Sequence, residues 1–198
     1  NSSHAVLFTE GSTDKIILEA AIQKLFPGET LNLVVQGAFD RIFLRNLFAR
    51  EELRKNYKDR KMFALFDFDE AFNDWDGLKF SKMVEDDPMR GLGKRLVHQS
   101  HYAFLLPVPQ DEILQQQALD ADGKPFSDSS ACIPIELLFC DRAELGDNFR
   151  TKAVMGGGEI VQFVGNKTTF AKKIAKRPVE AFECFRPLLE FIKAEVEG

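Results

Sequence analysis

Residues 62–69, MFALFDFD, are the stretch of sequence that decides the fold. Five apolar residues in succession are typical of a short β-strand that is buried on both faces of a sheet. The strand runs directly into Asp67-Phe68-Asp69, and residues two apart in an extended chain point to the same side. The stretch therefore predicts a core strand that ends in two carboxylates aimed at one point.

Two units of strand and helix come before this stretch. Residues 5–9, AVLFT, predict another buried strand, and Glu10 opens the turn that leads to a helix with apolar residues at helical spacing over 16–26. Residues 31–35 predict a second strand and residues 39–53 a second helix. The apolar stripe of this second helix is expected at Ile42, Phe43, Leu47 and Phe48. Buried strands that alternate with helices predict an α/β fold with a mostly parallel, Rossmann-like central sheet flanked by helices.

The rest of the chain predicts one domain, residues 1–198, rather than two. Residues 70–100 are polar and contain glycine and proline, which predicts an inserted helical or irregular segment. Residues 102–106 predict a further strand, and residues 168–196 the C-terminal helices. Shorter elements are expected at residues 133–139, 160–164, 168–176 and 179–196. The buried stripe of the last helix is expected at Phe182, Phe185, Leu188, Leu189 and Ile192.

The composition is that of a globular protein. Hydrophobic residues make up 44% of the chain and charged residues 29%, which is enough apolar sequence to form a core. No apolar run approaches the roughly 20 residues that cross a bilayer, and the first residues lack the pattern of a signal peptide. We therefore expect a cytoplasmic protein with no membrane partner. The net charge of -5 argues against a protein that coats nucleic acid by bulk attraction, but not against an enzyme whose carboxylates hold metal ions.

Cysteine, histidine and the glycine run do not predict a site. The cysteines are Cys132, Cys140 and Cys184. Their odd number and the lack of a CxxC pair argue against a disulfide framework or a zinc ribbon and predict buried thiols. His98 and His101 lack a third nearby ligand and are expected at the surface. Residues 156–158, GGG, predict a sharp break but no phosphate loop, because no Gly-Lys-Ser or Gly-Lys-Thr follows them.

The acids that follow the predicted strands are the candidate site. Glu10 follows one core strand, and Asp67 and Asp69 follow another two strands later. In parallel sheets, ligands bind beyond the carboxyl ends of the strands. Carboxylate oxygens are the ligands that Mg²⁺ and Mn²⁺ prefer, and one or two such ions can promote hydrolysis of a phosphodiester. Each acid alone is equally explained as a helix cap or a turn residue, so only their combination predicts a metal site.

This combination, residues 7–14 (LFTEGSTD) with residues 64–69 (ALFDFD), resembles the Toprim family. That family is shared by topoisomerases, bacterial primases, RNase M5-like maturases and the OLD-family nucleases, which are often paired with ATPase domains. The resemblance is close over the front third of the chain and loose over the remainder. It implies the Toprim fold and a site that holds one or two Mg²⁺ or Mn²⁺ ions. The catalytic and metal-binding acids that it implies are Glu10, Asp67 and Asp69, with Asp14 as a further acid of the metal site.

Two later residues resemble residues of the OLD-type nucleases. Glu136, within residues 133–136 (IPIE), is similar to the later acid that those enzymes place on a second metal. Lys167, within residues 165–171 (GNKTTFA), is similar to the catalytic lysine that precedes a helix and stabilises phosphoryl charge. The alternative for Lys167 is a surface lysine at a helix start. A candidate nucleic-acid-binding face consists of Lys167, Lys172, Lys173 and Lys176. A solvated helix face is the alternative for this set.

Among the activities of the family, the sequence favours a nuclease. A topoisomerase needs a tyrosine nucleophile and a larger body, whereas the chain has only Tyr57 and Tyr102, in contexts that suggest no such role. A primase usually needs a zinc module, for which no ligands are visible. We therefore expect a metal-dependent endonuclease acting on nucleic acid, DNA in preference to RNA, within a larger or partner-activated system such as phage defence or DNA repair. An ATPase domain or subunit and a second copy of the chain are candidate partners. The alternatives are a structured-RNA maturation nuclease and a non-catalytic Toprim-fold module that binds nucleotide or a partner protein.

Overall fold

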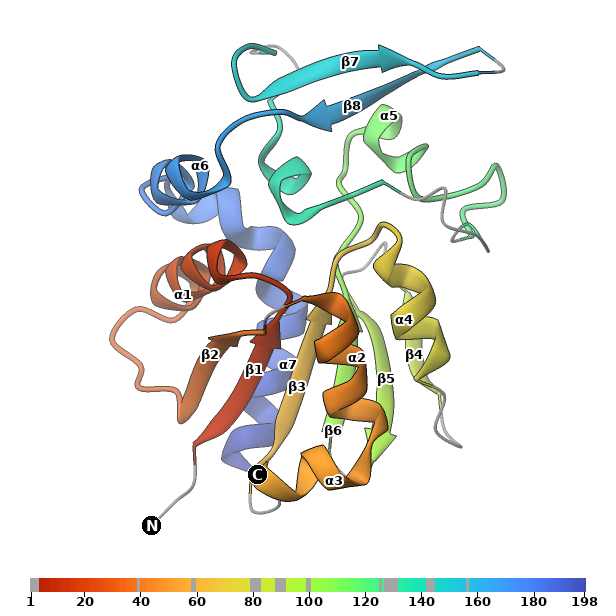
Figure 1. Ribbon diagram of the computed structural model, residues 1–198. Helices are drawn as coiled ribbons and strands as arrows, with labels where there is room; N and C mark the ends of the chain where they lie inside the picture. Colours follow the sequence, from red (N-terminus) through yellow and green to blue (C-terminus); the bar gives the residue numbers. More distant parts are fainter. Residues whose placement is uncertain are drawn as a thin grey trace.

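A mixed β-sheet forms the centre of the computed structural model (Figure 1). The structure describes residues 4–38, 40–57, 60–78, 83–87, 92–98, 101–124, 126, 132–141, 145–155 and 157–198, with the backbone only at 83–87, 92–96 and 98. The strands of the sheet are β1 (Ala5–Thr9), β2 (Leu33–Gly37), β3 (Met62–Phe66), β4 (Met83–Asp87), β5 (Leu92–His98) and β6 (His101–Leu105). They lie in the order β2-β1-β3-β6-β5-β4, and the first four strands in this order are parallel. The prediction of an α/β fold with a mostly parallel sheet is confirmed.

Helices cover both faces of the sheet (Figure 1). The face that carries α1 (Ser12–Leu25) and α7 (Arg186–Glu197) is opposite the face that carries α2 (Arg41–Ala49) and α4 (Ala71–Gly77). This arrangement follows from the strand order, because the chain leaves β1 toward β2 and then returns across β1 to β3. The direction of winding therefore reverses between β1 and β3, and a crevice for ligands opens at such a switch point.

The central strands have the burial that their apolar runs predict. Every residue of β1 and β3 is buried. Thr9, the last residue of β1, is paired with Gly37 of β2 and with Leu65 of β3. The residues that follow these strands therefore emerge side by side at one edge of the sheet.

Residues 70–100 were expected to form a helical or irregular insertion, and of their described elements only α4 agrees with this. They contain α4 and two strands, β4 and β5, which continue the sheet beyond β6 in antiparallel pairing. Polar composition suggested an excursion away from the core, but strands at the edge of an antiparallel sheet need few apolar residues.

The second helix was predicted with the wrong phase and length. Asp40 accepts a hydrogen bond from the Phe43 backbone N–H and so fixes the helix start. The buried stripe then falls on Leu44, Leu47 and Phe48, whereas the side chains of Ile42 and Phe43 are exposed. The helix ends before Arg50, whose extended backbone separates α2 from α3 (Glu51–Arg54) and the short 3-10 helix η1 (Lys55–Tyr57). Phe39, the expected first residue, lies outside the described residues.

The elements α5 (Glu112–Gln115), η3 (Ile135–Phe139), β7 (Phe149–Ala153) and β8 (Glu159–Phe163) lie above the carboxyl ends of the parallel strands in Figure 1. They are followed by α6 (Lys167–Ile174) and η5 (Val179–Phe185), which contact α1 and lead to α7 on the face of the sheet. The expected helix over 179–196 is thus 3-10 in its first half and α-helical only from Arg186. Its predicted buried stripe is confirmed. Within the described residues, no helix is long and apolar enough to cross a membrane.

His101 and the cysteines also differ from expectation. His101 is buried, and its Nδ1 accepts a hydrogen bond of 3.1 Å from the Met62 backbone N–H. The prediction of a surface histidine was therefore wrong at this position, while the side chain of His98 lies outside the described part. The three cysteines are free thiols, as expected, but they are half-buried rather than fully buried.

Candidate functional site

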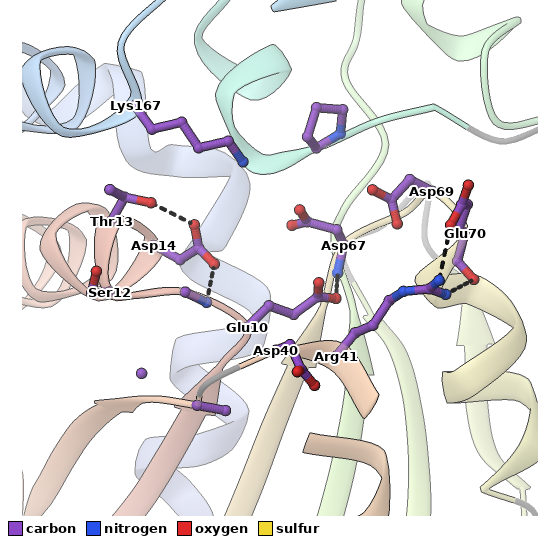
Figure 2. Close-up of a pocket in the computed structure, with 14 residues that line it drawn as sticks. Glu10, Ser12, Thr13, Asp14, Asp40, Arg41, Asp67, Asp69, Glu70 and Lys167 are labelled. Carbon is purple, nitrogen blue, oxygen red and sulfur yellow. Dashed lines mark hydrogen bonds and ion pairs between the residues drawn. The ribbon is translucent and has the colours of Figure 1, made fainter. Parts of the chain in front are cut away.

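A cavity of about 810 Å³ opens at the switch point between β1 and β3 (Figure 2). It is lined by Glu10, Gly11, Ser12, Thr13, Asp14, Gly37, Ala38, Asp40, Arg41, Asp67, Asp69, Glu70, Pro134 and Lys167. The candidate residues Glu10, Asp14, Asp67, Asp69 and Lys167 are thus brought to one cavity. Glu136 is not among the lining residues but contacts one of them, Lys167.

Glu10 and Asp67 are joined directly. The Glu10 Oε1 accepts a hydrogen bond of 2.9 Å from the Asp67 backbone N–H. This bond continues the pairing of β1 and β3 past the last residue of each strand, with a side chain in place of a carbonyl. It fixes the Glu10 carboxylate next to the Asp67 side chain, as Figure 2 shows.

Asp14 caps the helix that follows β1. Its Oδ2 accepts a hydrogen bond of 2.9 Å from the Gly11 backbone N–H, and the Thr13 hydroxyl donates to its Oδ1 at 3.4 Å. A Cβ at Gly37 would lie 3.1 Å from the Gly11 carbonyl oxygen, so glycine lets β2 approach the Gly11 turn closely without a shift of either backbone. The spacing Glu-Gly-x-x-Asp thus serves local folding as well as the cavity.

Asp69 lies at the start of α4. Its Oδ1 accepts a hydrogen bond of 2.8 Å from the Ala71 backbone N–H, while the other oxygen receives no hydrogen bond among the described residues. The residue is half-buried and lines the cavity. One carboxylate oxygen therefore holds the turn, and the other is available to a ligand.

Phe68, between the two aspartates, connects them to the segment that carries Glu136. The Phe68 N–H donates to the Ile133 carbonyl at 3.1 Å, and the Ile133 N–H donates to the Phe68 carbonyl at 2.8 Å. The Phe68 ring is fully buried. This isolated bridge brings residues 133–139 to the carboxyl end of β3.

Gln117 supports the same segment from the other side. It is almost fully buried, and its amide nitrogen donates to the carbonyls of Cys132 and Val161 at 3.0 Å each. Its Oε1 accepts from the Val161 N–H at 2.6 Å. The Gln117 amide therefore fastens the chain ahead of Glu136 to β8.

Glu136 and Lys167 form an ion pair at the site. The Lys167 Nζ lies 3.2 Å from the Glu136 Oε1. Glu136 is 1% exposed, and its Oε2 has no hydrogen-bond partner among the residues that the structure describes. Burying an unpaired carboxylate oxygen is costly, so this atom is a candidate to contact a bound cation.

Burial and mutual repulsion raise the pKa values of the acids. Burial raises the pKa of Glu10 to about 7 and that of Asp14 to about 6, and neighbouring carboxylates add to both effects. Burial, together with Asp14 and Glu10, holds the pKa of Asp67 well above its usual range, and burial also raises the pKa of Asp69. Burial opposes protonation of Lys167, but the ion pair with Glu136 and the charges of Asp67 and Asp14 together outweigh it and raise the pKa of the ammonium. The cluster therefore holds more negative charge than its surroundings stabilise, and a cation would relieve this.

The donor set fits a hard divalent cation. All the candidate ligands are carboxylates, and they come from the ends of β1 and β3, from α1 and from η3. In the described part of the chain, no three His, Cys, Asp or Glu side chains already converge as a metal-binding group. The cavity thus brings the oxygens together without closing them around a point.

Apart from Lys167, the candidate nucleic-acid-binding lysines lie away from the cavity lining. Lys172, Lys173 and Lys176 are exposed on and just after α6, and Lys173 lines a smaller cavity of about 150 Å³. Conversely, Arg41, Asp40 and Glu70 line the main cavity although the sequence offered no motif that singles them out.

No protein-family model matches the chain, and comparison with curated proteins and with solved structures found no similar protein.

Proposed function

We propose that the chain is a nuclease that hydrolyses phosphodiester bonds with the help of Mg²⁺ or Mn²⁺, with DNA as the preferred substrate. The observation that carries the proposal is the buried acid cluster at the switch point, with the unpartnered Oε2 of Glu136 beside Lys167. Such a cluster destabilises the metal-free chain, and a bound cation would compensate for this cost. The resemblance to Toprim nucleases agrees with this chemistry.

The proposed roles of the residues follow from their positions. Glu10, Asp67 and Asp69 would hold one ion, and Glu136 with Asp14 would complete the site or hold a second. The residues of this site would thereby hold a cation whose chemistry, when bound, would be charge neutralisation at the phosphoryl group and activation of a water molecule. Lys167 presents an ammonium at the edge of the same cavity, where it stabilises charge on the phosphoryl oxygens or the leaving group.

A cleavage assay tests the proposal. Supercoiled plasmid, linear DNA and structured RNA are incubated with Mg²⁺, Mn²⁺ or EDTA, and the wild type is compared with Asp67→Asn and with Glu19→Gln. Glu19 is the matched control, because it is an exposed acid on α1 outside the cavity. We expect metal-dependent cleavage that Asp67→Asn abolishes and Glu19→Gln leaves unchanged. Cleavage of RNA alone would favour the maturation nuclease, and metal binding without any cleavage would favour the non-catalytic module.

A further inference from the structure

Arg41 is a second cation of the cavity and has no role in the proposed hydrolysis. It is the first residue of α2 and lines the cavity on the side away from Lys167 (Figure 2). In that view the acids Glu10, Asp67 and Asp69 lie between the two cations.

The two terminal nitrogens of the Arg41 guanidinium contact different acids, one buried and one exposed. Its Nη1 lies 3.1 Å from the Asp74 Oδ2 and also donates to the Glu70 carbonyl at 3.3 Å. The Asp74 side chain is only 11% exposed. The Nη2 lies 2.9 Å from the Glu70 Oε2, and the Glu70 side chain is 65% exposed. Asp74 therefore orients the fork, while Glu70 occupies its outer end from the solvent side.

The outer contact is weak enough to exchange. An ion pair with so exposed a partner contributes about 0–1 kcal/mol. A phosphate offers the fork two oxygens in the geometry that arginine binds best, and arginine keeps its charge at any working pH. A nucleic-acid strand that enters an acidic cavity also needs cations for the phosphates that the metal does not contact.

We propose that Arg41 binds a backbone phosphate of the substrate adjacent to the phosphodiester that is cut, exchanging Glu70 for this phosphate while Asp74 keeps the guanidinium in place. The inference deepens the proposed nuclease function and rests on it. It places the substrate strand across the cavity, from the Lys167 side to the Arg41 side. In the absence of substrate, the Glu70 carboxylate occupies the position on the guanidinium that the phosphate would take.

Binding and cleavage of a fluorescein-labelled DNA strand and duplex test this proposal with four variants. Arg41→Gln removes the fork, Arg41→Lys keeps the charge only, and Glu70→Gln weakens the competing partner. Arg45→Gln is the matched control, because Arg45 also pairs with Asp74, at 3.5 Å, but does not line the cavity. Thermal unfolding of each variant shows whether it folds.

Binding is measured by fluorescence anisotropy in EDTA over a range of salt concentrations. We expect Arg41→Gln to weaken binding about 10-fold and to lower the salt dependence by about one phosphate contact. Arg41→Lys should weaken binding by about half as much as Arg41→Gln on a logarithmic scale, because the charge remains but the fork is lost. Glu70→Gln should tighten binding about threefold. The affinity of Arg45→Gln should stay within about twofold of that of the wild type. Equal losses for Arg41→Gln and Arg45→Gln, or no tightening for Glu70→Gln, would overturn the proposal.

Cleavage in Mg²⁺ separates the two proposals. Arg41→Gln should raise KM about 10-fold and leave kcat within about threefold, because the bound phosphate is not the reacting one. A fall in kcat without a change in KM would contradict the assigned role. A wild type that cuts no nucleic acid would overturn the nuclease function alone, since the anisotropy measurements still decide whether Arg41 binds phosphate.

Discussion

Glu10→Gln should stabilise the metal-free protein at high pH while removing its response to metal. The substitution keeps a side-chain oxygen that can accept the hydrogen bond from the Asp67 N–H, so the joint between β1 and β3 is preserved. It removes one charge from a cluster in which burial raises the pKa of Glu10 to about 7. The folding free energy should improve because an ionised, poorly solvated carboxylate is lost.

The size and sign of this effect follow from proton linkage. The pKa of Glu10 is raised from 4.5 to about 7 in the folded chain, which corresponds to about 3–4 kcal/mol at about 1.4 kcal/mol per pKa unit. Between these two pH values the folded chain binds the proton more tightly than the unfolded chain does. The stability of the wild type therefore falls as the pH rises through this window. Glu10→Gln should match the wild type below pH 4.5 and exceed it by up to about 3–4 kcal/mol above pH 7.

Urea unfolding in EDTA and in Mg²⁺, on both sides of this window, measures the effect. Glu19→Gln is the control, because this acid is exposed and should change stability by less than about 0.5 kcal/mol at either pH. Saturating Mg²⁺ should stabilise the wild type according to its affinity and leave Glu10→Gln nearly unchanged. If Glu10→Gln is no more stable than the wild type in EDTA above pH 7, the cluster does not destabilise the metal-free fold and the reasoning fails.

Three further substitutions test other contacts. Lys167→Met should lower kcat of the proposed cleavage by about 100-fold in steady-state kinetics, because the ammonium that pairs with Glu136 is lost. An unchanged kcat would mean that the lysine has only a structural role. Gln117→Leu should cost about 2–4 kcal/mol in urea unfolding, since it leaves buried backbone groups unpaired; a loss below about 0.5 kcal/mol would refute that role. Trp75→Phe should cost about 1–3 kcal/mol in the same assay, because the buried indole N–H donates to the Ala103 carbonyl at 3.0 Å, whereas a neutral result would mean that this bond is dispensable.

The positions of Glu10 and Asp67 at one edge of the sheet could be predicted, because each follows a recognisable apolar strand. The apolar runs before Glu10 and before Asp67 are long enough to be buried strands, and their order along the chain is enough to expect a parallel sheet. Because parallel strands end at one edge, the position of these two acids beside each other followed without any knowledge of pairing. The shared cavity agrees with this reasoning.

Residues that act singly through tertiary contacts were not predicted. Arg41 belongs to a helix start that looks like any exposed charged turn, and only the packing of α2 on α4 brings it to Asp74 and to the cavity. Gln117 is one polar residue in a run of glutamines, and its burial depends on β8, which comes much later in the chain. No local periodicity carries such information.

The buried face of the second helix was predicted incorrectly for a related reason. Several apolar residues lie within residues 39–53, and more than one stripe satisfies helical spacing. The Asp40 cap and the contacts of α2 with β3 and α4 select Leu44 over Ile42. The exposed Ile42 and Phe43 then lie beside Arg41 at the cavity end of the helix.

The Asp-x-Asp unit shows how this chain combines folding with chemistry. Alternation along an extended segment sends the Asp67 and Asp69 side chains into the cavity and the Phe68 side chain into the core. The Phe68 backbone then pairs with Ile133, and this pairing sets the position of Glu136, far along the chain. A middle residue that is large and apolar therefore anchors the third segment of the site, while its neighbours supply the oxygens. Because this bridge joins the segment of Glu136 directly to the Asp-x-Asp unit, a loss of packing at Phe68 should loosen the position of Glu136 relative to Asp67 and Asp69, although Gln117 still holds that segment to β8.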